Sequence, residues 1–145
     1  MTFTYVRELT LQYRKKNGES FEVVNAAGSA ALFIRRILPD NVREHFVVLL
    51  LDARLQVVSY YVAATGGASS CPVSEREVFQ AAVVAGAHAL VVAHNHPSGL
   101  PTPSAGDLVV TQRLKRAGEL LGIRVVDHVI IGAESHYSLA EQGSL

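Results

Sequence analysis

The sequence of 145 residues contains one cysteine, one methionine and no tryptophan, and its charges cancel. Its single cysteine, Cys71, cannot form a disulfide within the chain, which is typical of a protein in a reducing compartment. Thirteen Lys and Arg residues balance thirteen Asp and Glu residues. Because a neutral chain exerts no global attraction on DNA, we do not expect strong direct DNA binding.

Long hydrophobic segments are also absent. The longest apolar run, residues 46–51, is far shorter than the roughly 20 residues that a membrane-spanning helix needs. Arg7 and Glu8 interrupt the N-terminal segment, which therefore lacks the apolar region of a secretory signal peptide. These features predict a soluble cytoplasmic protein without membrane contact.

An apolar content of 49% over 145 residues is sufficient for one hydrophobic core. Neither an internal repeat nor a low-complexity linker divides the chain. We therefore expect a single domain over residues 1–145.

Hydrophobic periodicity and turn residues predict a mixed α/β fold. Two helices are expected to begin with capping boxes, Ser74-x-x-Glu77 and Ser104-x-x-Asp107. The predicted order is strand 2–14, helix 25–38, hairpin 44–65, helix 75–85, strand 89–94, helix 105–121, strand 124–132 and a short strand within 135–141. This order predicts one mixed β-sheet packed by about three helices.

Two histidines, His94 and His96, lie at the end of the predicted strand 89–94. Residues i and i+2 of a strand point to the same face, with α-carbons about 6.5 Å apart. Two imidazoles can then converge on one metal ion at about 2.0–2.1 Å each, whereas Asn95 points to the opposite face and is not a ligand candidate. A lone histidine is more often a core or surface residue, but this pair leads into a Pro- and Gly-rich loop and favours a metal site.

The next helix contributes Asp107 in its first turn. An acid there suits the helix dipole and the cap formed by Ser104, so capping alone could explain both residues. Capping also fixes a carboxylate in one orientation, as a metal ligand requires. Two nitrogens and one carboxylate oxygen leave a fourth position for water, the arrangement of a catalytic zinc site. Cys71 is better interpreted as a buried thiol than as a further ligand.

A hydrolytic zinc site also needs a general base. The candidates are Glu44, Glu75, Glu77, Asp127 and His128. Glu44 precedes the most apolar predicted strand, where partial burial would raise the pKa of its carboxyl group. An exposed acid at the start of a strand is the alternative interpretation. Composition alone leaves the choice among the candidates open.

The spacing His94-x-His96, seven residues, Ser104, two residues, Asp107 matches the H-x-H-x7-S-x2-D motif of JAMM/MPN metalloproteases. The segments HNHPSG, RLKRAGELLGIRVVDHVIIG and YSLAEQG resemble more closely still the RadC family, a bacterial branch of that superfamily. The resemblance covers about residues 30–145 and includes REHFVVLLLDARLQVV, the segment that carries the family's upstream glutamate. It implies an α/β fold of the JAMM/MPN type, with a cytidine-deaminase-like mixed sheet and flanking helices.

The resemblance also implies residue roles. His94, His96 and Asp107 would bind one Zn²⁺ per chain, Glu44 would deprotonate a water molecule, and Ser104 would donate a hydrogen bond to the oxyanion that forms. JAMM enzymes cleave peptide or isopeptide bonds, so the implied partner is a peptide or protein-conjugate substrate.

The sequence departs from the family pattern in two places. Longer RadC proteins carry a helix-hairpin-helix segment ahead of this domain, and we expect none in these 145 residues. The family's His-Pro before Arg76 is replaced by Ser74-Glu75, which concerns the substrate loop and not the ligands. Asp127 and His128 also match the family. Because adjacent strand residues face opposite sides, at most one of them is expected to contact a metal ligand.

Three other functions fit part of the pattern. A non-catalytic, metal-stabilised scaffold that recruits a partner in DNA repair or in mobile elements would keep the fold, but such scaffolds usually lack the ligands. A non-haem iron oxygenase uses two histidines and a carboxylate, but it would leave Glu44 and Ser104 without roles. A zinc nucleoside deaminase needs paired cysteines, and the chain has one.

Overall fold

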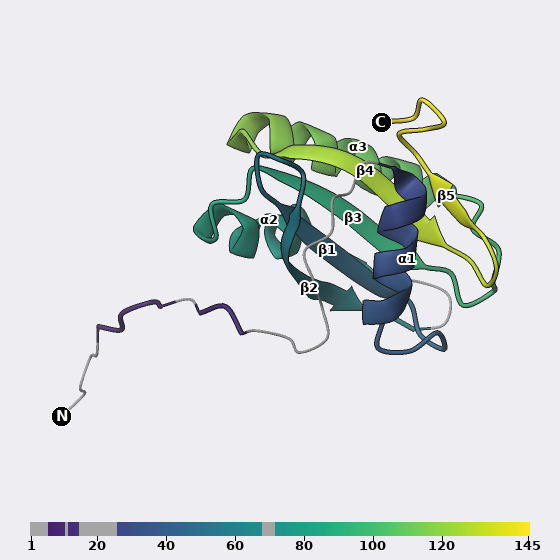
Figure 1. The fold of residues 1–145 in the computed structure, drawn as a ribbon, viewed down its shortest axis with the longest axis horizontal. Coiled ribbons are helices and arrows are strands. Elements are labelled where there is room, and N and C mark those ends of the chain that lie inside the picture. Colours follow the sequence, from purple (N-terminus) through teal and green to yellow (C-terminus); the bar gives the residue numbers. More distant parts are fainter. Residues whose placement is uncertain (1–5, 11, 15–25, 68–71) are drawn as a thin grey trace.

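The computed structural model describes residues 6–10, 12–14, 26–67 and 72–145. Within these ranges the chain forms a mixed sheet flanked by helices, as predicted (Figure 1). The elements are α1 (Ala27–Ile37), β1 (His45–Leu51), β2 (Val57–Thr65), α2 (Glu75–Val84), β3 (Ala89–Asn95), α3 (Ala105–Leu121), β4 (Arg124–Ile131) and β5 (His136–Ser138).

The five strands lie in the order β2-β1-β3-β4-β5. β3 pairs with β4 in parallel, and the other neighbouring pairs are antiparallel. β1 and β3 are buried at every position, as expected for strands covered on both faces. In their pairing Phe46 lies opposite His94, so the start of β1 lies beside the end of β3.

The sheet separates two hydrophobic clusters. Odd-numbered residues of β1 pack with α1, and even-numbered residues of β1 pack with α2 and α3, because strand side chains alternate between faces. Figure 1 shows α1 on one face of the sheet and α2 and α3 on the other. The residue just before β1, Glu44, follows the even-numbered series and therefore points toward the face of α2 and α3.

Local signals at the helix ends are confirmed. Both predicted capping boxes are present, with Ser74 and Glu77 at the start of α2 and Ser104 and Asp107 at the start of α3. α3 ends at Gly122, whose φ of +70° is a left-handed conformation that favours glycine. The cap of α3 holds Asp107 at the end of the sheet where β3 ends.

The predicted N-terminal strand is wrong for the residues that can be compared. Residues 6–10 and 12–14 form no strand, and Val6 and Leu9 are 99% and 77% exposed. An alternating pattern makes a strand only where a neighbouring strand pairs with it. Residues 2–5 and 11 of the predicted strand and residue 25 of the predicted helix lie outside the described residues, as does Cys71.

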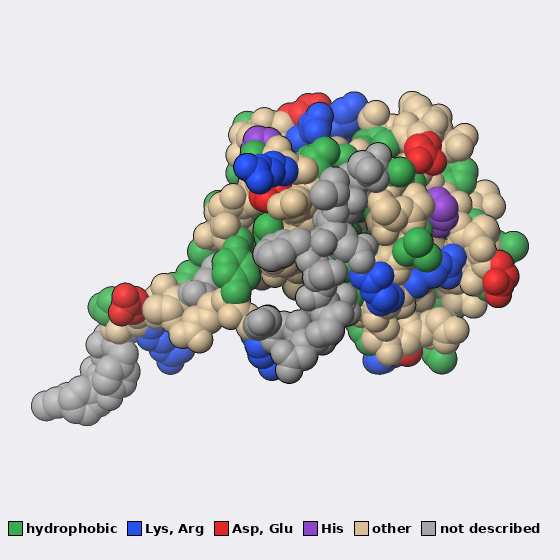
Figure 2. Space-filling view, in the orientation of Figure 1, with side chains coloured by type: hydrophobic (Ala, Val, Ile, Leu, Met, Phe, Trp, Pro, Cys, Tyr) green, Lys and Arg blue, Asp and Glu red, His purple; other side chains and the backbone are tan. Residues whose placement is uncertain are grey.

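Among the described residues, no helix is both long and apolar enough to cross a membrane. On the face drawn in Figure 2, Lys and Arg side chains are interspersed with acidic and uncharged ones.

At Gly118, α3 packs so closely on its neighbours that a side chain has no room. A Cβ atom there would lie 2.4 Å from the carbonyl oxygen of Ile123 and 3.4 Å from Phe79. Gly118→Ala is therefore expected to destabilise the fold by about 1–3 kcal/mol, despite the better helix propensity of alanine. Urea unfolding measures this change. Gly106→Ala is the control in the same helix, since its Cβ would meet only the Ser104 hydroxyl at 3.7 Å, and equal unfolding midpoints for the two variants would contradict the prediction.

Candidate metal centre

Three elements bring four ionisable side chains together at one end of the sheet. His94 lies at the end of β3 and His96 directly follows that strand, Asp107 comes from the first turn of α3, and Glu44 is the residue before β1. One ligand atom from each of the four side chains lies within 4.8 Å of the others, a grouping that could hold a metal ion. The three residues predicted as ligands and the glutamate predicted as base are therefore neighbours in space.

The distances suit a single small cation. Nε2 of His94 lies 3.0 Å from Nε2 of His96 and 3.2 Å from Oδ1 of Asp107, and Nε2 of His96 lies 3.2 Å from Oδ2 of Asp107. A tetrahedral ion with ligand bonds of about 2.0–2.1 Å separates its ligand atoms by about 3.3–3.4 Å. The donor set thus fits a tetrahedral cation after shifts of a few tenths of an ångström.

The hydrogen bond of His96 shows which of its nitrogens is available. Nδ1 of His96 lies 2.8 Å from the carbonyl oxygen of Leu100. A carbonyl oxygen can only accept, so Nδ1 carries the proton and Nε2 of the neutral ring presents a lone pair. This lone pair points toward another imidazole nitrogen and a carboxylate, which are themselves electron donors. A cation at this point would satisfy all of them.

The capping box positions Asp107. Oδ2 of Asp107 accepts from the backbone N–H of Ser104 at 2.8 Å, and the Ser104 hydroxyl accepts from the backbone N–H of Asp107 at 3.1 Å. Burial alone would raise the pKa of Asp107, but the nearby His94 and the hydrogen bonds with Ser104 outweigh it and hold the pKa well below its usual range. Capping and ligation are therefore compatible in this side chain.

Glu44 lies at the edge of the cluster and is buried. Its Oε1 is 3.8 Å from Nε2 of His94. Burial is the main influence on its pKa, which is raised above 4.5 although His94 and His96 oppose the shift. The ring of Phe46, two residues further on, stacks on His94 with centroids 5.9 Å apart. This packing keeps the start of β1 aligned with the histidines.

The structure distinguishes the five base candidates by position. Glu75 pairs with an arginine of α3, and Glu77 caps α2. Asp127 accepts hydrogen bonds from a serine hydroxyl and from two backbone N–H groups, those of the next residue and of the C-terminal turn. Of the five, Glu44 alone belongs to the four-residue cluster, whereas His128 reaches the cluster through His94.

His128 lies directly behind His94. It is completely buried, and its Nε2 is 2.8 Å from Nδ1 of His94. Burial, with the nearby His94, lowers the pKa of His128 to about 3, so the ring is neutral near pH 7. Asp127 faces the other side of β4 and bonds elsewhere. Of the two adjacent residues, one therefore contacts a predicted ligand.

Sequence reasoning missed two polar residues near the cluster, Asn95 and Thr111. The side chain of Asn95 accepts from the backbone N–H of His45 at 2.9 Å and donates to the carbonyl of Arg43 at 2.8 Å. It thus holds the backbone on both sides of Glu44. Both side chains are buried. A buried polar side chain needs a hydrogen-bond partner, and this requirement is the signal by which the two residues could have been identified.

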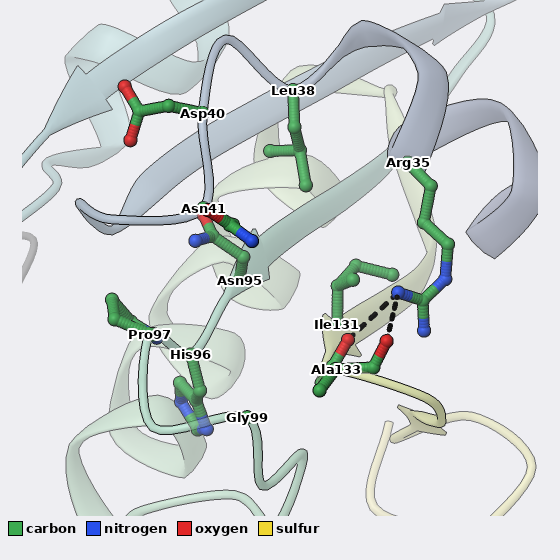
Figure 3. Close-up of a pocket in the computed structure, with 11 residues that line it drawn as sticks. Arg35, Leu38, Asp40, Asn41, Asn95, His96, Pro97, Gly99, Ile131 and Ala133 are labelled. Atoms are coloured by element: carbon green, nitrogen blue, oxygen red, sulfur yellow. Dashed lines mark hydrogen bonds between the residues drawn. The ribbon is translucent and has the colours of Figure 1, made fainter.

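A pocket of about 390 Å³ lies beside His96, between the loop after α1 and the ends of β3 and β4 (Figure 3). Its charged side chains, Arg35 and Asp40, already bond to other groups of the protein. Arg35 donates to the carbonyl oxygens of Gly132 and Ala133, and Asp40 pairs with Arg43. These pairs fix the walls of the pocket next to a predicted ligand.

Comparison with known proteins places the sequence among bacterial relatives. Residues 24–144 match the family model described as RadC-like JAB domain. A UPF0758 protein of Staphylococcus haemolyticus is 40% identical over 131 residues, which cover 90% of this chain and 57% of the relative. A UPF0758 protein of Pelobacter propionicus is 46% identical over 108 residues, 74% of this chain and 47% of the relative. The chain therefore spans about half the length of the curated relatives it matches, whose names state no activity.

Proposed function

Since the chain belongs to the RadC-like JAB domain family, we propose that it is a zinc-dependent hydrolase of peptide or isopeptide bonds. The observation that carries the proposal is the cluster of His94, His96, Asp107 and Glu44 within 4.8 Å. Three of these side chains can serve as ligands, and the fourth is a carboxylate in position to act as a base.

The proposed ligand atoms are Nε2 of His94, Nε2 of His96 and a carboxylate oxygen of Asp107. Imidazole nitrogen and carboxylate oxygen are both common zinc donors, and catalytic sites use three protein ligands with a fourth position open. When bound, zinc supplies Lewis-acid chemistry that polarises a carbonyl and acidifies water. His96 and Asp107 are half-buried, so this side of the proposed site is accessible to a substrate.

Glu44 is the proposed general base. Its carboxylate lies 3.8 Å from a ligand atom of the site, close enough to reach a water molecule held there. Burial raises the pKa of Glu44, which makes its carboxylate a stronger base. Glu44 would take a proton from the attacking water and transfer it to the leaving amine.

Ser104 is the proposed donor to the oxyanion. Its hydroxyl oxygen accepts from the backbone N–H of Asp107, which leaves the hydroxyl proton free to be donated. Ser104 is exposed at the N-terminus of α3, where the helix dipole stabilises negative charge. A developing oxyanion beside the metal ligand Asp107 would therefore meet both a hydroxyl donor and a favourable field.

Metal analysis with a cleavage screen tests the proposal. The purified chain is expected to hold about one zinc per molecule by elemental mass spectrometry, and to cleave peptides or isopeptide-linked conjugates. A chelator should abolish cleavage and added zinc should restore it. Zinc without cleavage would favour the metal-stabilised scaffold, iron would favour the oxygenase, and a chain purified without chelators that holds no metal would contradict the proposal.

A further inference from the structure

Three buried polar side chains form a hydrogen-bonded series behind the cluster. Thr111 on α3 places its hydroxyl oxygen 2.6 Å from the carbonyl oxygen of Asp107 and 2.6 Å from Nδ1 of His128. His128 on β4 places its Nε2 2.8 Å from Nδ1 of His94 on β3. All three side chains are at most 1% exposed. The series therefore links the backbone of one predicted ligand to the ring of another, away from solvent.

The direction of each hydrogen bond in this series follows from its ends. The carbonyl oxygen of Asp107 can only accept, so it takes the single hydroxyl proton of Thr111. The hydroxyl oxygen of Thr111 must then accept from His128, whose Nδ1 carries a proton.

The same reasoning continues to His94. A completely buried imidazole that is bonded to a hydroxyl group and another imidazole is neutral and carries one proton. With that proton on Nδ1, Nε2 of His128 accepts, and Nδ1 of His94 donates. Nε2 of His94 is left with a lone pair that faces His96 and Asp107.

We propose that Thr111 and His128 are positioning residues that hold His94 in the tautomer protonated at Nδ1, which presents Nε2 as a metal ligand. This inference rests on the proposed metal site and adds two residues outside the ligand set. A threonine hydroxyl that bonds the carbonyl four residues earlier is common in helices. The second bond, to a buried histidine that contacts His94, gives this threonine its role.

The two ligand histidines are oriented by different means. His96 donates to one backbone carbonyl, that of Leu100 in the connecting loop. His94 depends on two side chains from separate elements, α3 and β4. Removal of one hydroxyl group at Thr111 should therefore change the tautomer of His94 and leave that of His96 as it is.

The first test uses the unaltered protein without metal. Two-bond ¹H–¹⁵N NMR correlations of the imidazole rings report which nitrogen of each histidine is protonated. We expect Nδ1 of His128 and Nδ1 of His94 each to carry a proton, and Nε2 of His128 to carry none. A His128 ring protonated at Nε2 would overturn the proposal. Because this readout needs neither zinc nor a substrate, it decides the proposal even if the proposed hydrolase function fails.

The second test compares two variants of Thr111. Thr111→Val removes the hydroxyl group and keeps a similar side-chain volume, whereas Thr111→Ser keeps the hydroxyl group. Thr111→Val should mix the tautomers of His94 and lower zinc affinity by roughly 10–100-fold, the usual effect of losing a residue that orients a ligand. Thr111→Ser should stay close to the wild type in both readouts. Unchanged tautomers and zinc affinity in a folded Thr111→Val chain would overturn the proposal, and if that variant fails to fold, the wild-type spectrum decides.

Discussion

Asp107→Asn is expected to lower zinc affinity by roughly 100-fold while α3 stays folded. Asparagine keeps an oxygen that can accept from the backbone N–H of Ser104, but it loses the negative charge of the ligand. Structural zinc sites with four protein ligands bind with about 10–16 kcal/mol, so one ligand accounts for about 3 kcal/mol. That energy corresponds to roughly two orders of magnitude in affinity. Competition with a chromophoric chelator measures it.

Glu77→Gln is the matched control for this variant. Glu77 occupies the third position of α2 in the same capping box that Asp107 forms in α3, but it lies outside the metal cluster. Both amide exchanges keep the cap, so α2 and α3 should stay folded, and Asp107→Asn alone should weaken zinc binding. If both variants bind zinc as the wild type does, Asp107 is a cap and not a ligand.

Glu44→Gln is expected to lower the rate of hydrolysis by roughly 10²–10⁴-fold with the zinc content unchanged. Glutamine has the shape of glutamate but cannot take up a proton, and positioned general bases contribute a factor of this size. Elemental analysis and a cleavage assay on the same preparation separate metal binding from turnover. Loss of zinc together with activity would mean that Glu44 is a ligand.

Two further measurements sharpen the test at Glu44. Glu44→Asp keeps the carboxylate but withdraws it by one methylene, so its activity should lie between those of glutamine and the wild type. In the zinc-free chain, burial raises the pKa of Glu44, so ionisation of this side chain costs stability. The cost is absent below the usual pKa, near 4.5, and appears as the pH rises. Glu44→Gln should remove that part of the pH dependence of unfolding.

The parts of the fold that depend on local sequence could be predicted. Serine–acid capping boxes, Gly122 after α3 and the apolar run of β1 each act over a few residues, and the structure shows all of them. The His-x-His spacing likewise needs only the alternation of a strand. The N-terminal segment failed because a strand needs a partner elsewhere in the chain, which its own residues do not specify.

The proposed base and the residues that support the cluster could not be selected from the sequence, because their positions depend on contacts between distant segments. Glu44 joins the histidines only because β1 pairs with β3, which lies about 50 residues further along the chain. Thr111 reads as an ordinary helix residue until β4 places His128 against it. Such long-range register is set by the whole sheet, so composition and spacing could narrow the candidates but could not select among them.

The side-chain amide of Asn95 makes the sheet sensitive to its own alignment. Moving β1 by one residue along β3 would turn Glu44 to the opposite face. The same slip would remove both backbone partners of the buried Asn95 amide, at a cost of about 1–3 kcal/mol for each group left unpaired. A shift in pairing that turned Glu44 away from the histidines would therefore cost stability at Asn95, on the opposite face of the sheet. The fold by itself therefore favours the strand alignment that places Glu44 beside the histidines.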